Sequence, residues 1–221
     1  EHHGFGESTA NDYYGFSIES MASALEKARP LLESHSLEDP GDLWQELDGV
    51  LGNNPFAQCA LDQAAHDLWG KKCGKPVYQM WGLTIDRIPL TDYTIGIDEI
   101  DVMVAKMKEF PDWPIYKIKL GTPDDLDIVR ELRRHTDAVF RVDANCAWSA
   151  DETVRNSREL KKLNVQFIEQ PMAPDCWNEM KDVFRDSALP LIADESCIVP
   201  PDVGRCHGHF HGINIKLCKC G

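Results

Sequence analysis

Residues 139–170, VFRVDANCAWSADETVRNSRELKKLNVQFIEQ, contain the clearest indication of the fold. Two short runs rich in apolar and β-branched residues, Val139–Asn145 and Val165–Gln170, have the composition of strands. The amphipathic stretch Ala150–Leu163 between them is long enough for a helix. A strand, a helix and a second strand in this order predict a right-handed crossover between two parallel strands.

The same alternation continues on both sides of this unit, from residue 88 onward. It predicts an α/β fold with a parallel sheet, covered by helices on at least one face. The segment Arg205–His211 does not fit clearly into the alternation. The predicted strands are Leu90–Ile97, Ile115–Leu120, Val139–Asn145, Val165–Gln170, Leu189–Glu195 and Ile213–Leu217, and the predicted helices are Glu99–Glu109, Pro123–His135, Ala150–Leu163 and Asp175–Asp186.

Residues 1–85 have a different pattern. Gly4–Glu7 has the composition of a strand or turn, as in the remnant of a hairpin. The stretches Ser20–Leu32 and Pro55–Lys71 carry apolar residues at helical spacing, and glycines follow the second of them. We interpret both apolar stripes as core packing.

An ionisable side chain lies at or near the end of five successive predicted strands. In a closed parallel barrel the carboxyl ends of all strands open onto one face, where the chemistry takes place. Charges at equivalent positions of successive strands should therefore converge, and surface solvation alone does not account for five of them. In chain order they are Lys119 (with Lys117 two residues earlier), Asp143, Glu169, Asp194 and Lys216.

Asp143, Glu169 and Asp194 offer carboxylate oxygens without a thiol or an imidazole among them. Three clustered carboxylates repel one another unless a cation lies between them. Hard oxygen ligands select Mg²⁺, with Mn²⁺ as a substitute, over Zn²⁺. Three protein ligands also leave open positions for a substrate carboxylate. The sequence therefore predicts a magnesium site.

Lys119 and Lys216 flank the three carboxylates in the strand order, on the second and sixth strands, which lie opposite each other in a barrel. A lysine is a poor base at its reference pKa of about 10.4, and needs a pKa of roughly 7–8 to act near neutrality. Lys117 faces the same side of its strand as Lys119, so its like charge and the metal are expected to lower the pKa of Lys119. We predict that Lys119 and Lys216 are the catalytic residues.

Eight short motifs point to one family. They are Gly4–Glu7, Ala60–Asp62, Thr94–Ile97, Tyr116–Lys119, Val142–Asn145, Ile168–Pro171, Ala193–Ser196 and Asn214–Leu217. Together they resemble the muconate-lactonizing subgroup of the enolase superfamily. Within it the chain is most similar to the dipeptide epimerases of the L-Ala-D/L-Glu epimerase type. The five strand-end motifs are highly specific for the superfamily, and moderately specific for the epimerases.

The resemblance implies a modified (β/α)7β TIM-like barrel with an α+β capping domain. Residues 1–85 would be part of the capping domain, and residues 86–221 would be part of the barrel. Six strands are predicted where the family has eight, and the start of the family's capping domain is also missing, so we expect the chain to be incomplete at both ends. The family's Asp-x-Asp, which grips the substrate's α-ammonium group, falls on a later strand.

The resemblance also implies the chemistry. Mg²⁺ would be bound by Asp143, Glu169 and Asp194, and would stabilise an enediolate. Lys119 and Lys216 would move a proton on opposite faces of the α-carbon of a dipeptide's C-terminal residue. A lysine base acting together with Mg²⁺ is a general pattern of this superfamily. Two alternatives stay open: an o-succinylbenzoate synthase or muconate-type cycloisomerase with the same site, and an inactive barrel fragment.

Three further features lie beside these motifs. Asn145 is either a group supporting the metal site or a strand-end turn residue. Glu195 follows a predicted ligand directly, so it should face the other way and support the site at most. Cys206, His207, His209 and His211 could form a metal cluster, but exposed imidazoles before the sixth strand are the simpler interpretation.

Composition limits the class of protein. The chain has 221 residues and a net charge of −14, which argues against nucleic acid or an anionic membrane surface as a partner. No run approaches the roughly 20 apolar residues of a membrane helix. The eight cysteines are scattered without a CxxC pair, which indicates thiols in a reducing compartment such as the cytoplasm. A small-molecule dipeptide is the expected partner, and a homo-oligomer stays open.

Overall fold

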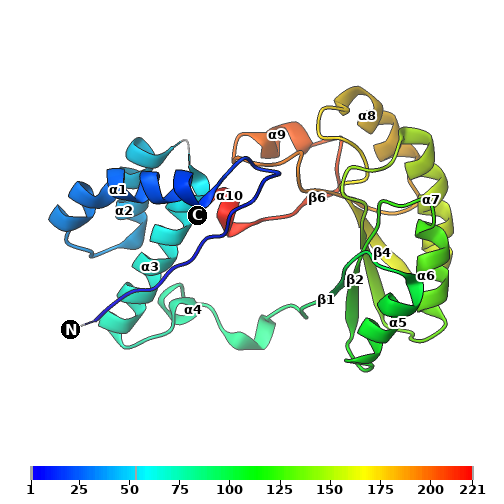
Figure 1. The fold of residues 1–221 in the computed structure, drawn as a ribbon, viewed down its shortest axis with the longest axis horizontal. Coiled ribbons are helices and arrows are strands. Elements are labelled where there is room, and N and C mark those ends of the chain that lie inside the picture. Colours follow the sequence, from blue (N-terminus) through cyan, green and yellow to red (C-terminus); the bar gives the residue numbers. More distant parts are fainter. Residues whose placement is uncertain (1, 53, 221) are drawn as a thin grey trace. The chain divides into compact units, whose positions relative to one another are not determined.

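The computed structural model describes residues 2–52 and 54–220, and the chain falls into two compact units (Figure 1). The first, which we call the helical unit, comprises Glu1–Ile88 together with Ile215–Gly221. The second, the sheet unit, comprises Pro89–Asn214. Each unit has its own hydrophobic core.

The helical unit contains three long helices and three short ones among its described residues. α1 and α3 confirm the helices predicted from apolar spacing, and a capping box at Ser17 and Ser20 begins α1. α2 was not predicted, although Asp39 caps its first turn and Pro40 starts it, which is a typical helix start. The elements are α1 (Ile18–Ser34), α2 (Pro40–Leu51), α3 (Pro55–Cys73), α4 (Val77–Met80), the 3-10 helix η1 (Ile85–Arg87) and α10 (Leu217–Cys220).

The amino-terminal segment is an extended arm that lies along α3. The prediction of a hairpin end at Gly4–Glu7 is wrong, because these residues form no strand. Phe5 N donates to Asp67 Oδ2 at 2.8 Å, and Gln63 Nε2 donates to the Glu7 carbonyl at 3.1 Å. The arm's backbone therefore finds its partners on a helix instead of a neighbouring strand.

Gly6 allows this close approach, and Gly6→Ala should destabilise the protein. A Cβ at this position would collide with the Ala60 carbonyl on α3. We expect a loss of about 1–3 kcal/mol in the free energy of unfolding, measured by urea titration, since the backbone must move away. The control is Gly49→Ala inside α2, where a Cβ meets nothing within 4 Å and should stabilise by about 0.5–1 kcal/mol. Equal effects of the two substitutions would contradict this packing.

The sheet unit is a six-stranded parallel sheet in which strand order follows sequence order. A helix follows each of the first five strands, and consecutive order is the order of a (β/α) barrel. The α/β prediction is confirmed. The elements are β1 (Tyr93–Ile95), α5 (Ile100–Lys108), β2 (Ile115–Lys119), α6 (Asp125–Arg133), β3 (Val139–Asp143), α7 (Ala150–Lys162), β4 (Val165–Glu169), α8 (Trp177–Asp186), β5 (Leu191–Ala193), α9 (Asp202–Cys206) and β6 (Gly212–Ile213).

The two faces of this sheet differ in chemistry. One face packs against the helices, as Figure 1 shows for α5 to α7, and its side chains form the core of the unit. Tyr116, Ile118, Phe140, Val142 and Ile168 are fully buried there. Because side chains alternate along a strand, the residues between them point to the opposite face. That face carries the predicted charges of β2, β3 and β4.

The last predicted strand is shorter than expected. The prediction of a strand over Ile213–Leu217 is wrong beyond Ile213, since residues 214–216 are irregular and Leu217 begins α10. Among the described residues β6 pairs only with β5, so one ladder holds it. Fewer cross-strand contacts favour an early end of the strand.

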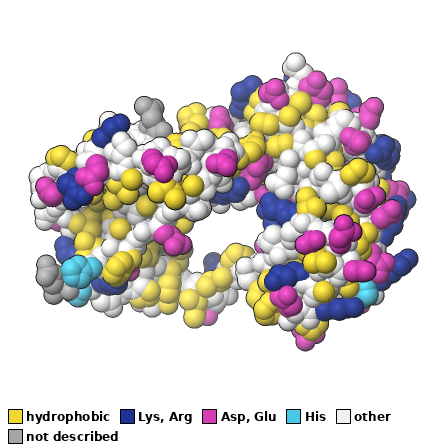
Figure 2. All heavy atoms as spheres, in the orientation of Figure 1, with side chains coloured by type: hydrophobic (Ala, Val, Ile, Leu, Met, Phe, Trp, Pro, Cys, Tyr) yellow, Lys and Arg dark blue, Asp and Glu magenta, His cyan; other side chains and the backbone are white. Residues whose placement is uncertain are grey.

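The outer helices carry charges of both signs. Ion pairs one turn apart follow α6 and α7, such as Arg130–Asp127 at 2.8 Å and Lys162–Glu159 at 2.6 Å. On the face drawn in Figure 2, Lys and Arg side chains are interspersed with Asp and Glu. Among the described helices none is both long and apolar enough to span a membrane.

Candidate active site

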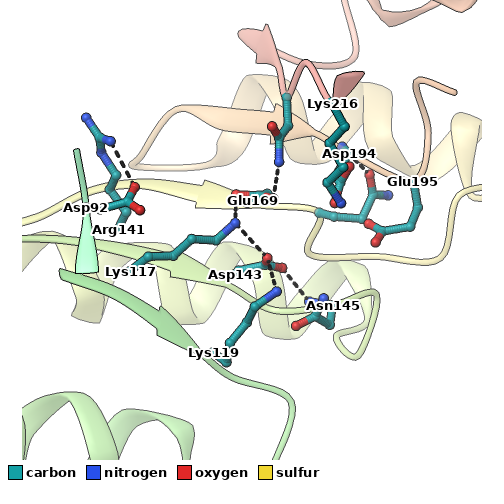
Figure 3. A network of polar contacts seen from close by, with 12 residues as sticks. Asp92, Lys117, Lys119, Arg141, Asp143, Asn145, Glu169, Asp194, Glu195 and Lys216 are labelled. Carbon is teal, nitrogen blue, oxygen red and sulfur yellow. Dashed lines mark hydrogen bonds and ion pairs between the residues drawn. The ribbon is translucent and has the colours of Figure 1, made fainter. Parts of the chain in front are cut away.

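Three carboxylates lie at the carboxyl ends of neighbouring strands. Asp143 ends β3, Glu169 ends β4, and Asp194 directly follows β5. Asp143 is paired with Glu169 in register, and Glu169 is paired with Ile192, so Asp194 falls on the same face two residues further. All three residues are buried, with at most 3 % of their surface exposed. Figure 3 shows them at one edge of the sheet.

Two lysines of β2 contact these carboxylates. Lys117 Nζ lies 3.0 Å from Asp143 Oδ2 and 2.7 Å from Glu169 Oε2, so it bridges the two strand ends. Lys119 Nζ lies 2.7 Å from the same Asp143 oxygen (Figure 3). The predicted alternation therefore holds: both lysines point to the same face, and their ammonium groups are neighbours.

The charges set the protonation states of this network. Burial alone would raise the pKa of Asp143, but Lys117 and Lys119 outweigh it and hold that pKa below its usual value. Burial, together with the charge of Asp143, raises the pKa of Glu169. Burial opposes the charge of Lys117, yet Asp143 and Glu169 raise its pKa overall. Lys117 thus stays protonated, and Glu169 is the carboxylate that takes up a proton before Asp143 does.

The donor set fits a hard divalent cation in its chemistry. Three buried carboxylates on adjacent strand ends supply the oxygen ligands that Mg²⁺ prefers. In the part of the chain that the structure describes, however, no three acidic, histidine or cysteine side chains form a group that could hold a metal ion. Lys117 lies between two of the carboxylates, because buried negative charge needs a cation close by. In this structure Lys117 and Lys119 supply the positive charge beside these oxygens.

Lys216 belongs to the helical unit, whereas the three carboxylates belong to the sheet unit. It follows β6 by three residues, in the irregular segment before α10. Its Nζ is 3.5 Å from the Tyr14 hydroxyl oxygen and 5.8 Å from the centroid of that ring. Its catalytic role stays a prediction.

Asn145 and Glu195 flank the carboxylates. Asn145 N donates to Asp143 Oδ1 at 3.1 Å, and Asn145 and Cys146 both adopt left-handed backbone conformations, with φ of 46° and 66°. This tight turn orients the Asp143 side chain through a backbone contact. Glu195 Oε2 lies 3.9 Å from Cys146 Sγ, on the loop after β5.

Two residues without a predicted role also contact the site. Asn214 Nδ2 donates to Glu169 Oε1 at 2.7 Å. Gln170 Oε1 accepts from Asp194 N at 2.9 Å. Both residues belong to the strand-end motifs. The alternation of side chains from Gly212 places Asn214 on the same face as the carboxylates, and this pattern could have predicted its position.

The histidines before β6 have structural partners. His211 Nδ1 accepts from Leu191 N at 3.1 Å, and its ring stacks on Phe184 with centroids 4.3 Å apart. The His209 ring meets the edge of Trp177. His209 and His211 thus pack against neighbouring aromatic rings.

Asp125 ties the loop after β2 to the loop after β3. Its Oδ1 accepts from Gly121 N at 2.9 Å and from Thr122 N at 2.8 Å, and its Oδ2 accepts from Trp148 Nε1 at 2.7 Å. The side chain is buried, and no sequence pattern indicates this contact because the partners lie on different loops. It holds the turn that follows Lys119.

Asp125→Asn should lower the free energy of unfolding by about 1–3 kcal/mol, since an amide NH₂ group would replace an oxygen that accepts from buried donors. Urea titration measures the loss. The matched control is Asp127→Asn on the same helix, whose carboxylate is exposed and should change stability by less than about 0.5 kcal/mol. Equal stability of both variants would contradict the role of Asp125.

Parallel strands in sequence order, with carboxylates and lysines at their carboxyl ends, define a protein of the (β/α) barrel class. Residues 102–221 match the family model described as enolase C-terminal domain-like, and residues 3–82 match the mandelate racemase / muconate lactonizing enzyme N-terminal domain. The chain belongs to the enolase superfamily, in its mandelate racemase / muconate lactonizing enzyme family.

Comparison with known proteins gives closely similar relatives. The chain is 56 % identical over 218 residues to the L-Ala-D/L-amino acid epimerase of Flavobacterium johnsoniae, covering 99 % of this chain and 65 % of that protein. It is 38 % identical over 222 residues to the L-Ala-D/L-Glu epimerase of Bacteroides thetaiotaomicron, covering 98 % and 57 %. The crystal structure of the dipeptide epimerase from Enterococcus faecalis, complexed with Mg and L-Leu-L-Tyr, aligns with a TM-score of 0.90 at 30 % identity, covering 99 % and 64 %. The chain therefore spans less than two thirds of these proteins.

Proposed function

We propose that the protein is a Mg²⁺-dependent epimerase that moves the α-proton of the C-terminal residue of a dipeptide. The observation that carries this proposal is the pairing of Lys119 with Asp143, beside Glu169 and Asp194 on neighbouring strand ends. The names of the relatives favour epimerisation over the synthase or cycloisomerase alternatives.

The carboxylates and Lys117 prepare the site. Asp143, Glu169 and Asp194 would hold Mg²⁺, with Mn²⁺ as a substitute. Bound there, the ion supplies positive charge to the substrate carboxylate as the α-proton leaves. Lys117, which stays protonated, adds a second positive charge between Asp143 and Glu169.

Lys119 is the proposed base for one face of the α-carbon. A lysine takes up a proton only in its neutral form, so Lys119 must release the carboxylate of Asp143 before it acts. The 2.7 Å contact with Asp143 therefore engages Lys119 Nζ in this structure. Asp143 is thus both a candidate metal ligand and the residue that contacts the proposed base.

Lys216 is the proposed base for the opposite face. Asn214 contacts Glu169, and two residues of extended chain span at most about 7 Å, so the backbone of Lys216 begins within that distance of Asn214. Inversion at carbon needs one group to remove the proton and another to return it from the other side. Two lysines at the ends of different strands meet that requirement.

The test is α-proton exchange in the full-length protein. A library of dipeptides is incubated in D₂O with Mg²⁺, and the mass of the C-terminal residue is followed. We expect a gain of one deuterium together with epimerisation, and neither in the presence of EDTA. Exchange with no dipeptide, or exchange that EDTA leaves unchanged, would contradict the proposal.

The proposal extends to the domain organisation and the cellular compartment of the protein. We assign residues 1–85 to part of a capping domain and residues 86–221 to part of a barrel. We also propose a cytoplasmic protein, because the eight cysteines are scattered along the sequence without a CxxC pair.

A further inference from the structure

Gln170 follows Glu169 directly, and its side chain is fully buried. The amide makes four hydrogen bonds. Its Oε1 accepts from Asp194 N at 2.9 Å and from Ser196 N at 3.1 Å. Its Nε2 donates to the Met172 carbonyl and to Ser196 Oγ, both at 2.8 Å. Each donor and acceptor position of the amide is used, which fixes its orientation.

The backbone of Gln170 is equally constrained. Its φ of 33° lies in the left-handed region, which residues other than glycine adopt only where the surroundings hold them there. Gln170 N donates to the Ile192 carbonyl at 2.8 Å, and the Gln170 carbonyl accepts from Cys146 N at 2.8 Å. One residue therefore connects the ends of β3, β4 and β5.

The side chain acts where the regular pairing of β4 with β5 ends. The register couples Glu169 with Ile192, and the chain then turns at Gln170. Asp194 N has passed the last paired residue of β5, and the side-chain oxygen of Gln170 provides its acceptor instead. The direction of a side chain along a strand depends on the backbone, since a shift by one residue turns it to the other face.

We propose that Gln170 is a positioning residue, which continues the β4–β5 ladder through its side chain and thereby holds Asp194 at a set spacing from Glu169. This inference rests on the proposed function of both carboxylates as Mg²⁺ ligands. Ser196 completes the arrangement, because it both donates to and accepts from the same amide.

The experiment compares three variants of the full-length protein. Gln170→Met keeps the length of the side chain and removes its four hydrogen bonds. Ser196→Ala removes one of them and leaves the contact with Asp194 N. The matched control is Ser157→Ala, a buried serine whose Oγ accepts from Ala188 N at 2.9 Å before β5 begins. The Kd for Mn²⁺ is measured by electron paramagnetic resonance, and Tm is measured without metal.

We expect Gln170→Met to raise the Kd about 10- to 100-fold, and Ser196→Ala to raise it by less. Ser157→Ala should lower Tm and leave the Kd unchanged. An unchanged Kd for Gln170→Met, or an equal rise for Ser157→Ala, would overturn the proposal. If Gln170→Met does not fold, the Kd values for Mn²⁺ of Ser196→Ala and Ser157→Ala are compared in the same way.

A second measurement separates this inference from the proposed function. Amide hydrogen exchange of residues 192–198 is followed in the metal-free protein. Gln170→Met should accelerate amide exchange in this segment and Ser157→Ala should not. Equal amide exchange rates in the two variants would overturn the proposed positioning role of Gln170. A wild-type protein that binds no Mn²⁺ or Mg²⁺ would overturn the proposed function. The amide hydrogen exchange of residues 192–198 would still decide whether Gln170 holds Asp194.

Discussion

Lys216→Ala should abolish epimerisation and leave α-proton exchange with one epimer of the dipeptide, and Lys119→Ala should leave exchange with the other. Each lysine is proposed to serve one face of the α-carbon, so each removes the proton from one epimer only. Exchange needs a single base, because the same group returns a solvent deuteron. Epimerisation needs both, because the proton must return from the other side.

Loss of a general base lowers the rate by about 10²–10⁴-fold, so the remaining exchange should stand out clearly from the lost direction. Deuterium uptake is followed separately with the L,L and L,D dipeptides. Lys106→Ala is the matched control, since this lysine pairs with Glu109 on the exposed surface of α5. If both variants lose exchange with both epimers equally, the two-base arrangement is wrong and a single-base lyase explains the site better.

Glu169→Gln should remove metal binding without destabilising the metal-free protein. Loss of groups that only support metal ligands raises the Kd about 10- to 100-fold, so loss of a ligand charge should raise the Kd for Mg²⁺ by at least about 100-fold. For the stability of the metal-free protein, the same substitution should be favourable or neutral, because the pKa of Glu169 is raised. Because burial and Asp143 disfavour the ionised carboxylate, its charge opposes folding above that pKa, and a neutral amide removes the effect.

Isothermal titration with Mg²⁺ and thermal unfolding at pH 7 measure the two effects. The Tm of metal-free Glu169→Gln should equal or exceed that of the wild type, although Lys117 keeps only Asp143 as its partner. Glu179→Gln, on the exposed face of α8, should change neither quantity. Wild-type affinity for Mg²⁺ in Glu169→Gln would remove Glu169 from the set of ligands.

The parallel sheet could be predicted because each of its strands and helices is indicated by a pattern of consecutive residues. β-branched runs mark β2, β3 and β4 to within about two residues of their observed ends, and each helix between them has its own apolar stripe. Asp143 and Glu169 could be placed at strand ends for the same reason. The position of Asp194 beside them follows once the strands are taken in order.

Other features have weaker local patterns. The strand predicted over Ile213–Leu217 ends at Ile213, since a strand of this composition still depends on the ladders available to it. Gly4–Glu7 has the composition of a strand or turn, yet its partners are Asp67 and Gln63 on a helix. In both cases the neighbour, which is distant in sequence, decides the conformation.

The identity and order of the charged residues come from the chain alone: lysine, aspartate, glutamate, aspartate and lysine at successive strand ends. Their contacts come from the fold. Lys117 reaches both Asp143 and Glu169 because three strands lie in register, and Gln170 reaches Asp194 because β4 turns where its pairing with β5 ends. A hydrogen bond or an ion pair depends on distances of about 3 Å, which periodicity does not encode and which only the packed strands establish.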